Sequence, residues 1–377
     1  MRRRRWIFLA LPLMAALVLL YTTLTGNNYI YKAIVYNYAD IDDYLLFSNR
    51  TVKAGAAQPW PLAINYNKIR PPAALRHELD SIKTVAFVVL KNDSICYEEY
   101  WDHYSASSRS NSFSCSKSII GILTGIALDE GAIRSLDDPI GDYIKDFMDP
   151  AMKSVTIRNL LMMSSSTDWD ESYSGLLSQT TKGYYGTSLY QQMSELRLTG
   201  APGKTFAYRS GDTQLLSMVL QAATGQTISD YASLKLWQPI GAEQDALWSL
   251  DHDGGIEKAY CCFNSNARDF ARIGDLYLHH GNWRGTQIVS AGYVQQSLSP
   301  VNLPDETGKV TDYYGYQWWL MPERGNIFYA RGLNGQWIIC IPDKHMVIVR
   351  LGHQRGPKML NAYREVYDMV DWAIAVF

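Results

Sequence analysis

The apolar positions form β-rich runs near residue 85 and then continue at helical spacing. The stretch "TVAFVVLKNDSICYEEYW" places β-rich runs at residues 85–90 and 94–101 on either side of Asn92–Asp93, which predicts a hairpin. The stretch "SKSIIGILTGIALDEGAI" follows, with apolar residues at i, i+3 and i+4 and a glycine at its end. We therefore expect a hairpin followed by a long, strongly apolar helix.

Helical spacing dominates the middle of the chain, and β-rich runs return near its end. Helices are predicted for "SVTIRNLLMM", "TSLYQQMSELRL", "TQLLSMVLQAAT", "ISDYASLKLW" and "SNARDFARIGDLYLHH". Strands are predicted for "NIFYARG", "GQWIICI" and "HMVIVRLG", and a closing helix for residues 360–377. The simplest architecture is an α/β (α+β) fold: an antiparallel sheet from about 80–130 and 300–377, flanked by helices, with an all-helical domain inserted at about 135–295.

The N-terminal residues have a pattern of their own. Four arginines, Arg2 to Arg5, precede an apolar run over residues 6–24. This is typical of an export signal, and the run approaches the ~20 residues that span a bilayer. Because few small residues follow it, we expect an uncleaved anchor over 1–26, with a cleaved signal as the alternative. The rest would then lie outside the cytoplasm, anchored to the inner membrane or in the periplasm.

Two further segments follow that run. Residues 27–74 are aromatic and polar and end at the break Pro71–Pro72, which indicates a lead-in arm. Residues 75–377 then form the main domain.

Composition excludes several classes of function. Of the 377 residues, 47% are hydrophobic, which permits a large core, and the net charge of -2 argues against a nucleic-acid partner. The five cysteines lack zinc spacing and the seven histidines are scattered, so no metal site is expected. We expect the cysteines to be buried thiols, since neighbours such as Cys261 and Cys262 seldom bond each other. The oligomeric state stays open.

A serine and a lysine stand where the long helix begins. In "SCSK", Ser114 and Lys117 are at i and i+3, so their side chains share one face of the helix. Burial lowers the pKa of a lysine, and a neutral lysine can take the proton of a serine nucleophile. The alternatives are a helix cap for Ser114 and a side chain of Lys117 that reaches solvent. The apolar "SIIGILTGIAL" that follows argues against the second alternative.

A second candidate group lies in "PGKTFAYRSGDTQLL". Tyr208 and Ser210 come between a turn and a predicted helix. A tyrosine held near a lysine could titrate low enough to relay a proton. The alternative is an aromatic side chain that only packs.

Together these motifs resemble the serine β-lactamase and penicillin-binding-protein superfamily, from about residue 85 to the end of the chain. The resemblance is to the class C-like branch, which includes esterases and 6-aminohexanoate-dimer hydrolases. Further support comes from "LDDPIGDYI", "VTIRNLLMMSSSTDWDE", "LWQPIGAEQDALWSLD" and "NARDFARIGDLYLHHGNW".

The resemblance implies a role for each motif residue. Ser114 would be the acylated nucleophile and Lys117 its proton partner. Tyr208 would match the Y-x-[NS] tyrosine that assists proton transfer to the leaving group, and Ser210 the third position of that motif.

The third motif of the family is usually K-T-G or H-x-G on a strand at the sheet edge, and it aligns here with Ala330-Arg331-Gly332. The N–H groups of Leu333 and Ser114 would form the oxyanion hole, with Asn334 beside them. Ala330 stands where the family lysine would bind a carboxylate, so efficient β-lactamase or D,D-peptidase activity is not expected. Arg331 is a candidate replacement, although adjacent residues of a strand point to opposite faces.

The expected function is that of an exported serine hydrolase which cleaves a small amide or ester through an acyl-enzyme, without a cofactor. β-Lactamase or D,D-peptidase activity is one alternative, and a non-catalytic envelope binding protein is another. Four aromatic residues are candidates for the pocket wall, although packing is the expected role for any one of them: Trp169, Tyr184, Tyr185 and Trp337.

Overall fold

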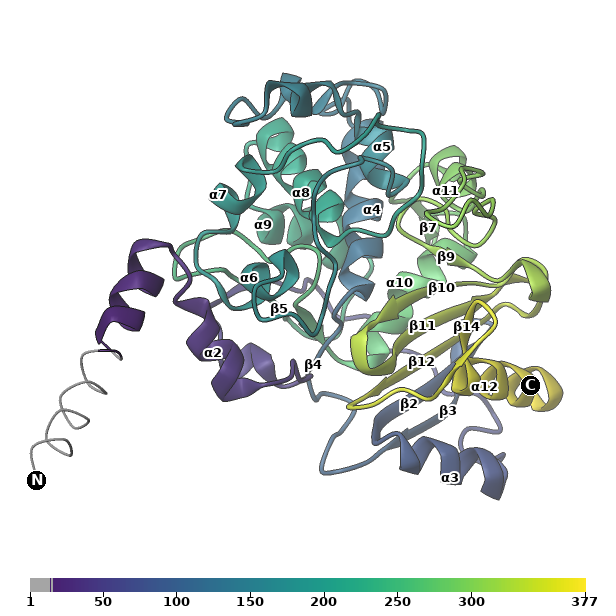
Figure 1. The fold of residues 1–377 in the computed structure, drawn as a ribbon. Coiled ribbons are helices and arrows are strands. Elements are labelled where there is room, and N and C mark those ends of the chain that lie inside the picture. The colour runs from purple at the N-terminus through teal and green to yellow at the C-terminus, as the bar shows by residue number, and fades with distance from the viewer. Residues whose placement is uncertain (1–13, 15) are drawn as a thin grey trace, which may run out of the picture.

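The main sheet is antiparallel and joins both ends of the chain, in the order β3-β2-β12-β11-β10-β9 (Figure 1). The computed structural model describes residues 14 and 16–377. The strands are β2 (Thr84–Lys91), β3 (Ser94–Tyr100), β9 (Trp319–Leu320), β10 (Phe328–Gly332), β11 (Gln336–Ile341) and β12 (Met346–Gly352). The pairing of β2 with β12 confirms that the predicted hairpin and the C-terminal strands form one sheet.

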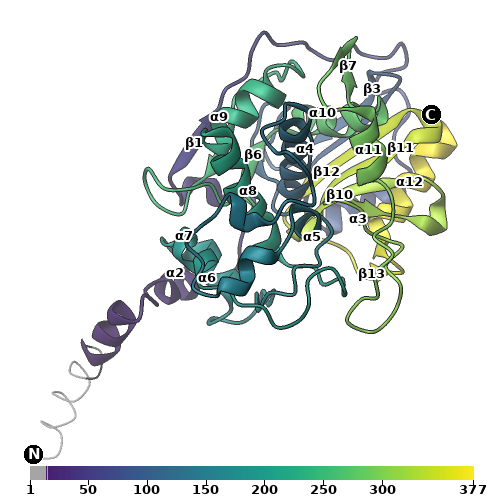
Figure 2. The same cartoon turned by 90° about the horizontal axis from the view of Figure 1, so that it is seen from above.

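Both faces of this sheet are buried, because helices cover each of them. Along β2, Val88 and Leu90 belong to one apolar cluster, whereas Phe87 and Val89 belong to the other. The first cluster includes α4 (Cys115–Asp129) and α10 (Ala267–Leu278), and the second α3 (Ala73–Ser81) and α12 (Arg364–Val376). Figure 2 shows α12 on the side of the sheet opposite to α4 and α8.

The middle of the chain is helical, as predicted, but it also contains strands. Its helices are α5 (Ile157–Leu161), α6 (Gln179–Tyr185), α7 (Leu189–Ser194), α8 (Ser210–Thr224), α9 (Ile228–Ala232) and α11 (Ala291–Ser297). A second sheet, in the order β1-β5-β6-β4, consists of β1 (Asn49–Val52), β4 (Ser110–Asn111), β5 (Ala246–Ser249) and β6 (Phe263–Ser265). The expectation of an all-helical insert is therefore wrong, because strands this short give no periodic signal. Two small hairpins complete the fold: β7 (Asn282–Trp283) with β8 (Thr286–Gln287), and β13 (Lys358–Met359) with β14 (Ala362–Tyr363).

The N-terminal segment runs along the body of the protein. Helix α2 (Tyr29–Tyr36) packs against α6, and β1 pairs with β5. Of the anchor expected over residues 1–26, residues 1–13 and 15 lie outside the described residues. Within the described part of the chain, no helix has both the length and the apolarity needed to cross a bilayer.

Candidate active site

Ser114 lies at the N-terminal end of α4, after a tight turn in the backbone. Phe113 has a φ of 45°, and its N–H donates to Asn111 Oδ1 at 2.9 Å. Bulky residues rarely adopt a positive φ, and such strain often occurs at functional sites. The hydroxyl of Ser114 does not cap the helix, and its oxygen lies 3.0 Å from Lys117 Nζ. The serine is therefore held against the lysine.

Lys117 is buried under this serine, with only 1% of its surface exposed. Its Nζ contacts three oxygen atoms: Ser114 Oγ at 3.0 Å, Ser210 Oγ at 3.0 Å and the Tyr260 carbonyl at 2.8 Å. Burial lowers the pKa of Lys117 to about 8, although the charge of Glu171 acts in the opposite direction. The expected fall in the lysine pKa is confirmed, and a side chain that reaches solvent is excluded.

Tyr208 approaches the same lysine from the loop before α8. Its ring centroid lies 5.2 Å from Lys117 Nζ and 5.3 Å from the ring of Trp319. Burial raises the pKa of Tyr208, and the charge of Glu171 adds to the rise, whereas Arg331 and the hydroxyl of Ser114 lower it less. The prediction of a tyrosine that titrates low is therefore wrong. The phenol keeps its proton at neutral pH and is available as a proton donor.

Ser210 connects the lysine to a carboxylate that the sequence did not reveal. Its Oγ lies 2.7 Å from Glu171 Oε1, and its N–H donates to Glu171 Oε2 at 2.6 Å. The indole N–H of Trp169 also donates to Oε2, and the phenol of Tyr173 donates to Oε1. Glu171 comes from the loop before α6, within the quoted stretch "TDWDE". No spacing in that loop distinguishes Glu171 from its acidic neighbours.

The end of β10 packs tightly against the turn that carries Ser114. A Cβ atom on Gly332 would lie 2.2 Å from the Ser112 carbonyl oxygen, so this close approach requires glycine. Leu333 and Asn334 follow at the wall of the cavity. Among the residues that the structure describes, the N–H groups of Ser114 and Leu333 donate to no other group of the protein. Both amides are therefore available to a ligand.

A cavity of about 860 Å³ opens above Ser114, within the usual size range of small-molecule sites. Tyr184 and Tyr185 line it, as does Ile34 of α2, so the N-terminal segment helps to build the site. Glu171 is the one charged side chain in the wall, and no lysine, arginine or histidine lines the cavity within the described part of the chain.

Two aromatic candidates for the pocket wall, and the candidate replacement for the family lysine, do not line the cavity. Trp337 is fully buried in the second core cluster, and Trp169 packs against Tyr260. The guanidinium carbon of Arg331 lies 3.5 Å from the ring centroid of Trp319, and Arg331 is not part of the cavity wall. Arg331 is therefore not placed to replace the family lysine.

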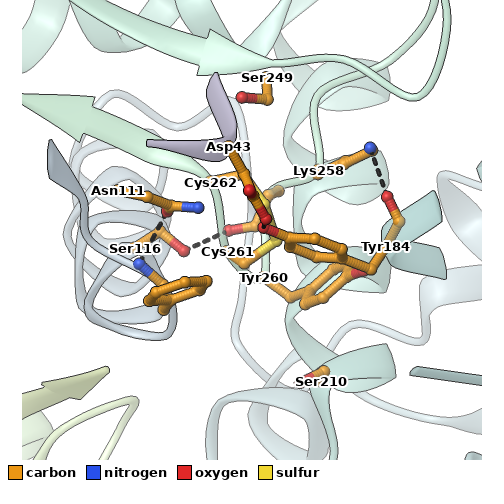
Figure 3. Close-up of a disulfide and its surroundings, with 12 residues drawn as sticks. Asp43, Asn111, Ser116, Tyr184, Ser210, Ser249, Lys258, Tyr260, Cys261 and Cys262 are labelled. Carbon is orange, nitrogen blue, oxygen red and sulfur yellow. Dashed lines mark hydrogen bonds between the residues drawn. A yellow bond between two sulfur atoms is a disulfide. The ribbon is translucent and has the colours of Figure 1, made fainter. Parts of the chain in front are cut away.

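A disulfide bond joins the neighbours Cys261 and Cys262 beside the site (Figure 3). The expectation that both are free thiols is wrong, whereas Cys96, Cys115 and Cys340 are free and buried as expected. Cys262 has a φ of 70°, and Cys261 lines the cavity directly after Tyr260, whose carbonyl holds Lys117. The disulfide thus closes the chain turn that places this carbonyl.

Among the described residues, one group has the spacing of metal ligands: Asp93, Asp275 and His279. None of the three lines the cavity.

A family model described as Beta-lactamase matches residues 73–369. The chain belongs to the beta-lactamase family. This beta-lactamase family protein is 28% identical to the 6-aminohexanoate-dimer hydrolase of Paenarthrobacter ureafaciens over 302 residues, 75% of this chain and 76% of that relative. The resemblance found in the sequence is thereby confirmed.

Solved structures show the same fold. A Bacillus anthracis protein, provisionally named as a 6-aminohexanoate-dimer hydrolase, has a TM-score of 0.71 at 23% identity, with 88% of this chain and 90% of that chain covered. A family VIII carboxylesterase has a TM-score of 0.64 at 16% identity, with 85% and 99% covered. At these identities the likeness shows the fold alone.

Proposed function

We propose that this protein is a serine hydrolase that cleaves an amide or ester bond through an acyl-enzyme on Ser114. The observation that carries the proposal is the contact of 3.0 Å between Ser114 Oγ and the buried Nζ of Lys117. A lysine whose pKa is near 8 is partly neutral at neutral pH and can accept the serine proton.

In the proposed reaction each of these groups has one step. Ser114 Oγ bonds to the carbonyl carbon as its proton moves to Lys117, and the N–H groups of Ser114 and Leu333 stabilise the oxyanion. When the scissile bond breaks, the leaving group takes a proton from Tyr208, which receives one from Lys117 in return. Deacylation follows the same steps in reverse, with water in place of the leaving group. Tyr208 passes its proton to Lys117 and takes one from the water, whose oxygen attacks the acyl carbon. The ester bond to Ser114 then breaks, the acid is released, and Ser114 recovers its proton from Lys117.

The charge of the cavity wall limits the class of substrate. Among the residues that the structure describes, Glu171 is the one charged side chain in the wall, and Ala330 replaces the family lysine, so an anionic substrate finds no cation there to bind. We infer a neutral or cationic substrate. The name of the Paenarthrobacter relative gives a 6-aminohexanoate dimer as its substrate, and we extend only the class of short linear amides to this chain.

We also propose that the protein is exported and anchored by its N-terminal segment. The arginines before the apolar run and a disulfide, which persists in oxidising compartments, support this location. Recovery of the intact N-terminus in a washed membrane fraction would agree with it, and recovery only in the cytosolic fraction would refute it.

A fluorophosphonate probe tests the enzymatic proposal without a known substrate, because it phosphonylates activated serines. We expect the wild-type protein to be labelled at Ser114, as mapped by peptide mass spectrometry, and the Ser114→Ala variant to show no labelling. The Ser116→Ala variant is the matched control, because this buried serine of the same helix hydrogen-bonds the Ala259 carbonyl instead of Lys117. Absence of labelling in folded wild-type protein between about pH 6 and 10 would favour a binding protein. Stoichiometric labelling by a fluorescent penicillin, or turnover of nitrocefin, would favour the β-lactam alternative.

A further inference from the structure

The proton of the Ser210 hydroxyl determines which way the amine of Lys117 faces. A neutral amine has two N–H bonds and one lone pair, and Lys117 Nζ has three oxygen neighbours. The Tyr260 carbonyl has no proton, so it takes one N–H of Lys117. The second N–H goes to Ser210 or to Ser114, whichever oxygen does not donate its own proton to the amine.

Glu171 decides between these two serines. Four donors converge on its carboxylate: the N–H and O–H of Ser210, the indole of Trp169 and the phenol of Tyr173. A carboxylate with four donors acts only as an acceptor, so the Ser210 proton points at Glu171 and the Ser210 oxygen accepts from Lys117. The lone pair of the amine is then left for the hydroxyl of Ser114.

We propose that Glu171 is a positioning residue which, by accepting the Ser210 proton, directs the lone pair of neutral Lys117 at Ser114. The inference rests on the proposed function, because it concerns the removal of the Ser114 proton. Glu171 touches neither Ser114 nor Lys117 through a hydrogen bond in this arrangement, and it acts through Ser210.

The Glu171→Gln variant tests this orientation. Its amide oxygen is expected where Oε2 accepts two N–H groups, which leaves the NH₂ group facing the Ser210 oxygen. The Ser210 proton must then turn to Lys117 and occupy its lone pair. Since a general base typically contributes 10²–10⁴-fold, we expect the fluorophosphonate labelling rate at high pH to fall by about 10²-fold.

The pH profile of labelling tests whether a charged Glu171 acts on Lys117. Labelling requires neutral Lys117, so the rate rises with pH through the lysine pKa of about 8. Burial lowers this pKa most and the charge of Arg331 adds to the fall, whereas Glu171 and Cys115 raise it. The phenols of Tyr208 and Tyr260 also face the amine, and burial raises the pKa of both, so they stay protonated across this range. In Glu171→Gln the midpoint should therefore move to lower pH while the plateau falls. Because glutamine carries no charge even where the loop is displaced, the midpoint shows only that Glu171 is charged beside Lys117, and the cycle with Ser210→Ala separates positioning from a loss of structure.

A double-mutant cycle with Ser210→Ala tests whether Glu171 acts through Ser210. We expect Glu171→Gln to lower the labelling rate by about 10²-fold in the wild-type background, and by less than about threefold once Ser210 is alanine. Asp170→Asn is the matched control, because it removes a neighbouring exposed charge of the same loop that contacts Ser172 and not Ser210. Its labelling rate and midpoint should equal those of the wild type.

Each outcome supports or overturns a separate claim. No labelling of the wild type refutes the proposed function, whereas labelling of Glu171→Gln at the wild-type rate and midpoint refutes only the role of Glu171. The role of Glu171 is also overturned if Glu171→Gln lowers the labelling rate by the same factor with Ser210 and with alanine at that position. If Glu171→Gln does not fold, Ser210→Ala decides: a loss of about 10²-fold at the wild-type melting temperature supports the proposal, and a loss under about threefold overturns it.

Discussion

At the scale of one residue, the burial that lets Lys117 lose its proton near neutral pH also lowers the stability of the fold. Its pKa falls from 10.5 to about 8 because folding takes the charge out of water. Below about pH 8 the amine is charged in both states, and burial costs about 3 kcal/mol. Between pH 8 and 10.5 the unfolded chain binds more protons than the folded protein, so this cost disappears as the pH rises.

We therefore predict that Lys117→Met abolishes labelling of Ser114 and yet stabilises the fold. Methionine fills a similar volume without a charge, and the three oxygens that lose a donor offset part of the gain. At pH 7 the free energy of unfolding should rise by about 1–3 kcal/mol. Urea unfolding at pH 7 and at pH 10.5 measures the effect, and the gain should shrink at the higher pH. A variant less stable than the wild type at pH 7 would contradict the argument.

The residues of the site differ in how far the sequence predicts them. Ser114, Lys117, Tyr208 and Ser210 stand in motifs, because local spacing on a helix or before one fixes their relative positions, and the structure brings all four together. Glu171 was missed because its partner Ser210 lies 39 positions away and only tertiary packing joins them. The sign of the Tyr208 pKa shift was also wrong, because burial depends on neighbours such as Trp319 that are distant in sequence.

At the scale of the element, the short chain turn at Tyr260–Cys262 connects α4 to the cavity wall. One carbonyl of this turn accepts from Lys117, and the next side chain lines the cavity. The disulfide closes the turn, so its sulfur atoms restrain the backbone next to Lys117, the proposed general base.

We predict that reduction of Cys261–Cys262 lowers the reactivity of Ser114. A dithiol converts the bond to two thiols and is itself oxidised to a disulfide, and it reaches Cys261 from the cavity. Small displacements of a catalytic group cost up to 10²-fold, so the labelling rate should fall by about tenfold. Labelling is compared before and after reduction, with alkylation of both cysteines to show that reduction is complete. Cys96→Ser should respond like the wild type, and an unchanged rate after complete reduction would contradict the prediction.

The whole molecule has the architecture that its sequence pattern indicates, except for elements whose positions depend on partners distant in the sequence. Strands β2, β11 and β12 have six to eight residues and are buried along almost their whole length, so their apolar runs identify them as strands of one covered sheet. The short strands β1, β5 and β6 have three or four residues each and depend on partners up to 200 positions away. For the same reason the sequence did not show that α2 would line the cavity.

The cavity as a whole predicts discrimination by charge. A p-nitrophenyl ester with a neutral or cationic acyl chain should react faster than one with a terminal carboxylate, since Glu171 repels an anion and no cation lines the wall in the described part of the chain. We expect about a tenfold lower kcat/KM for the carboxylate at low salt, with a smaller difference at high salt.

If the cavity wall causes this preference for neutral or cationic esters, a cationic side chain added to the wall should oppose it. Leu176 lines the cavity and is exposed, whereas its neighbour Leu177 is more exposed and does not line it. Leu176→Lys should raise kcat/KM for the carboxylate ester by roughly tenfold and leave the neutral ester within twofold, because the new charge acts only on a charged chain. Leu177→Lys is the control and should change the ratio of the two esters little. An equal response in both variants would mean that general surface charge, and not the cavity wall, selects the substrate.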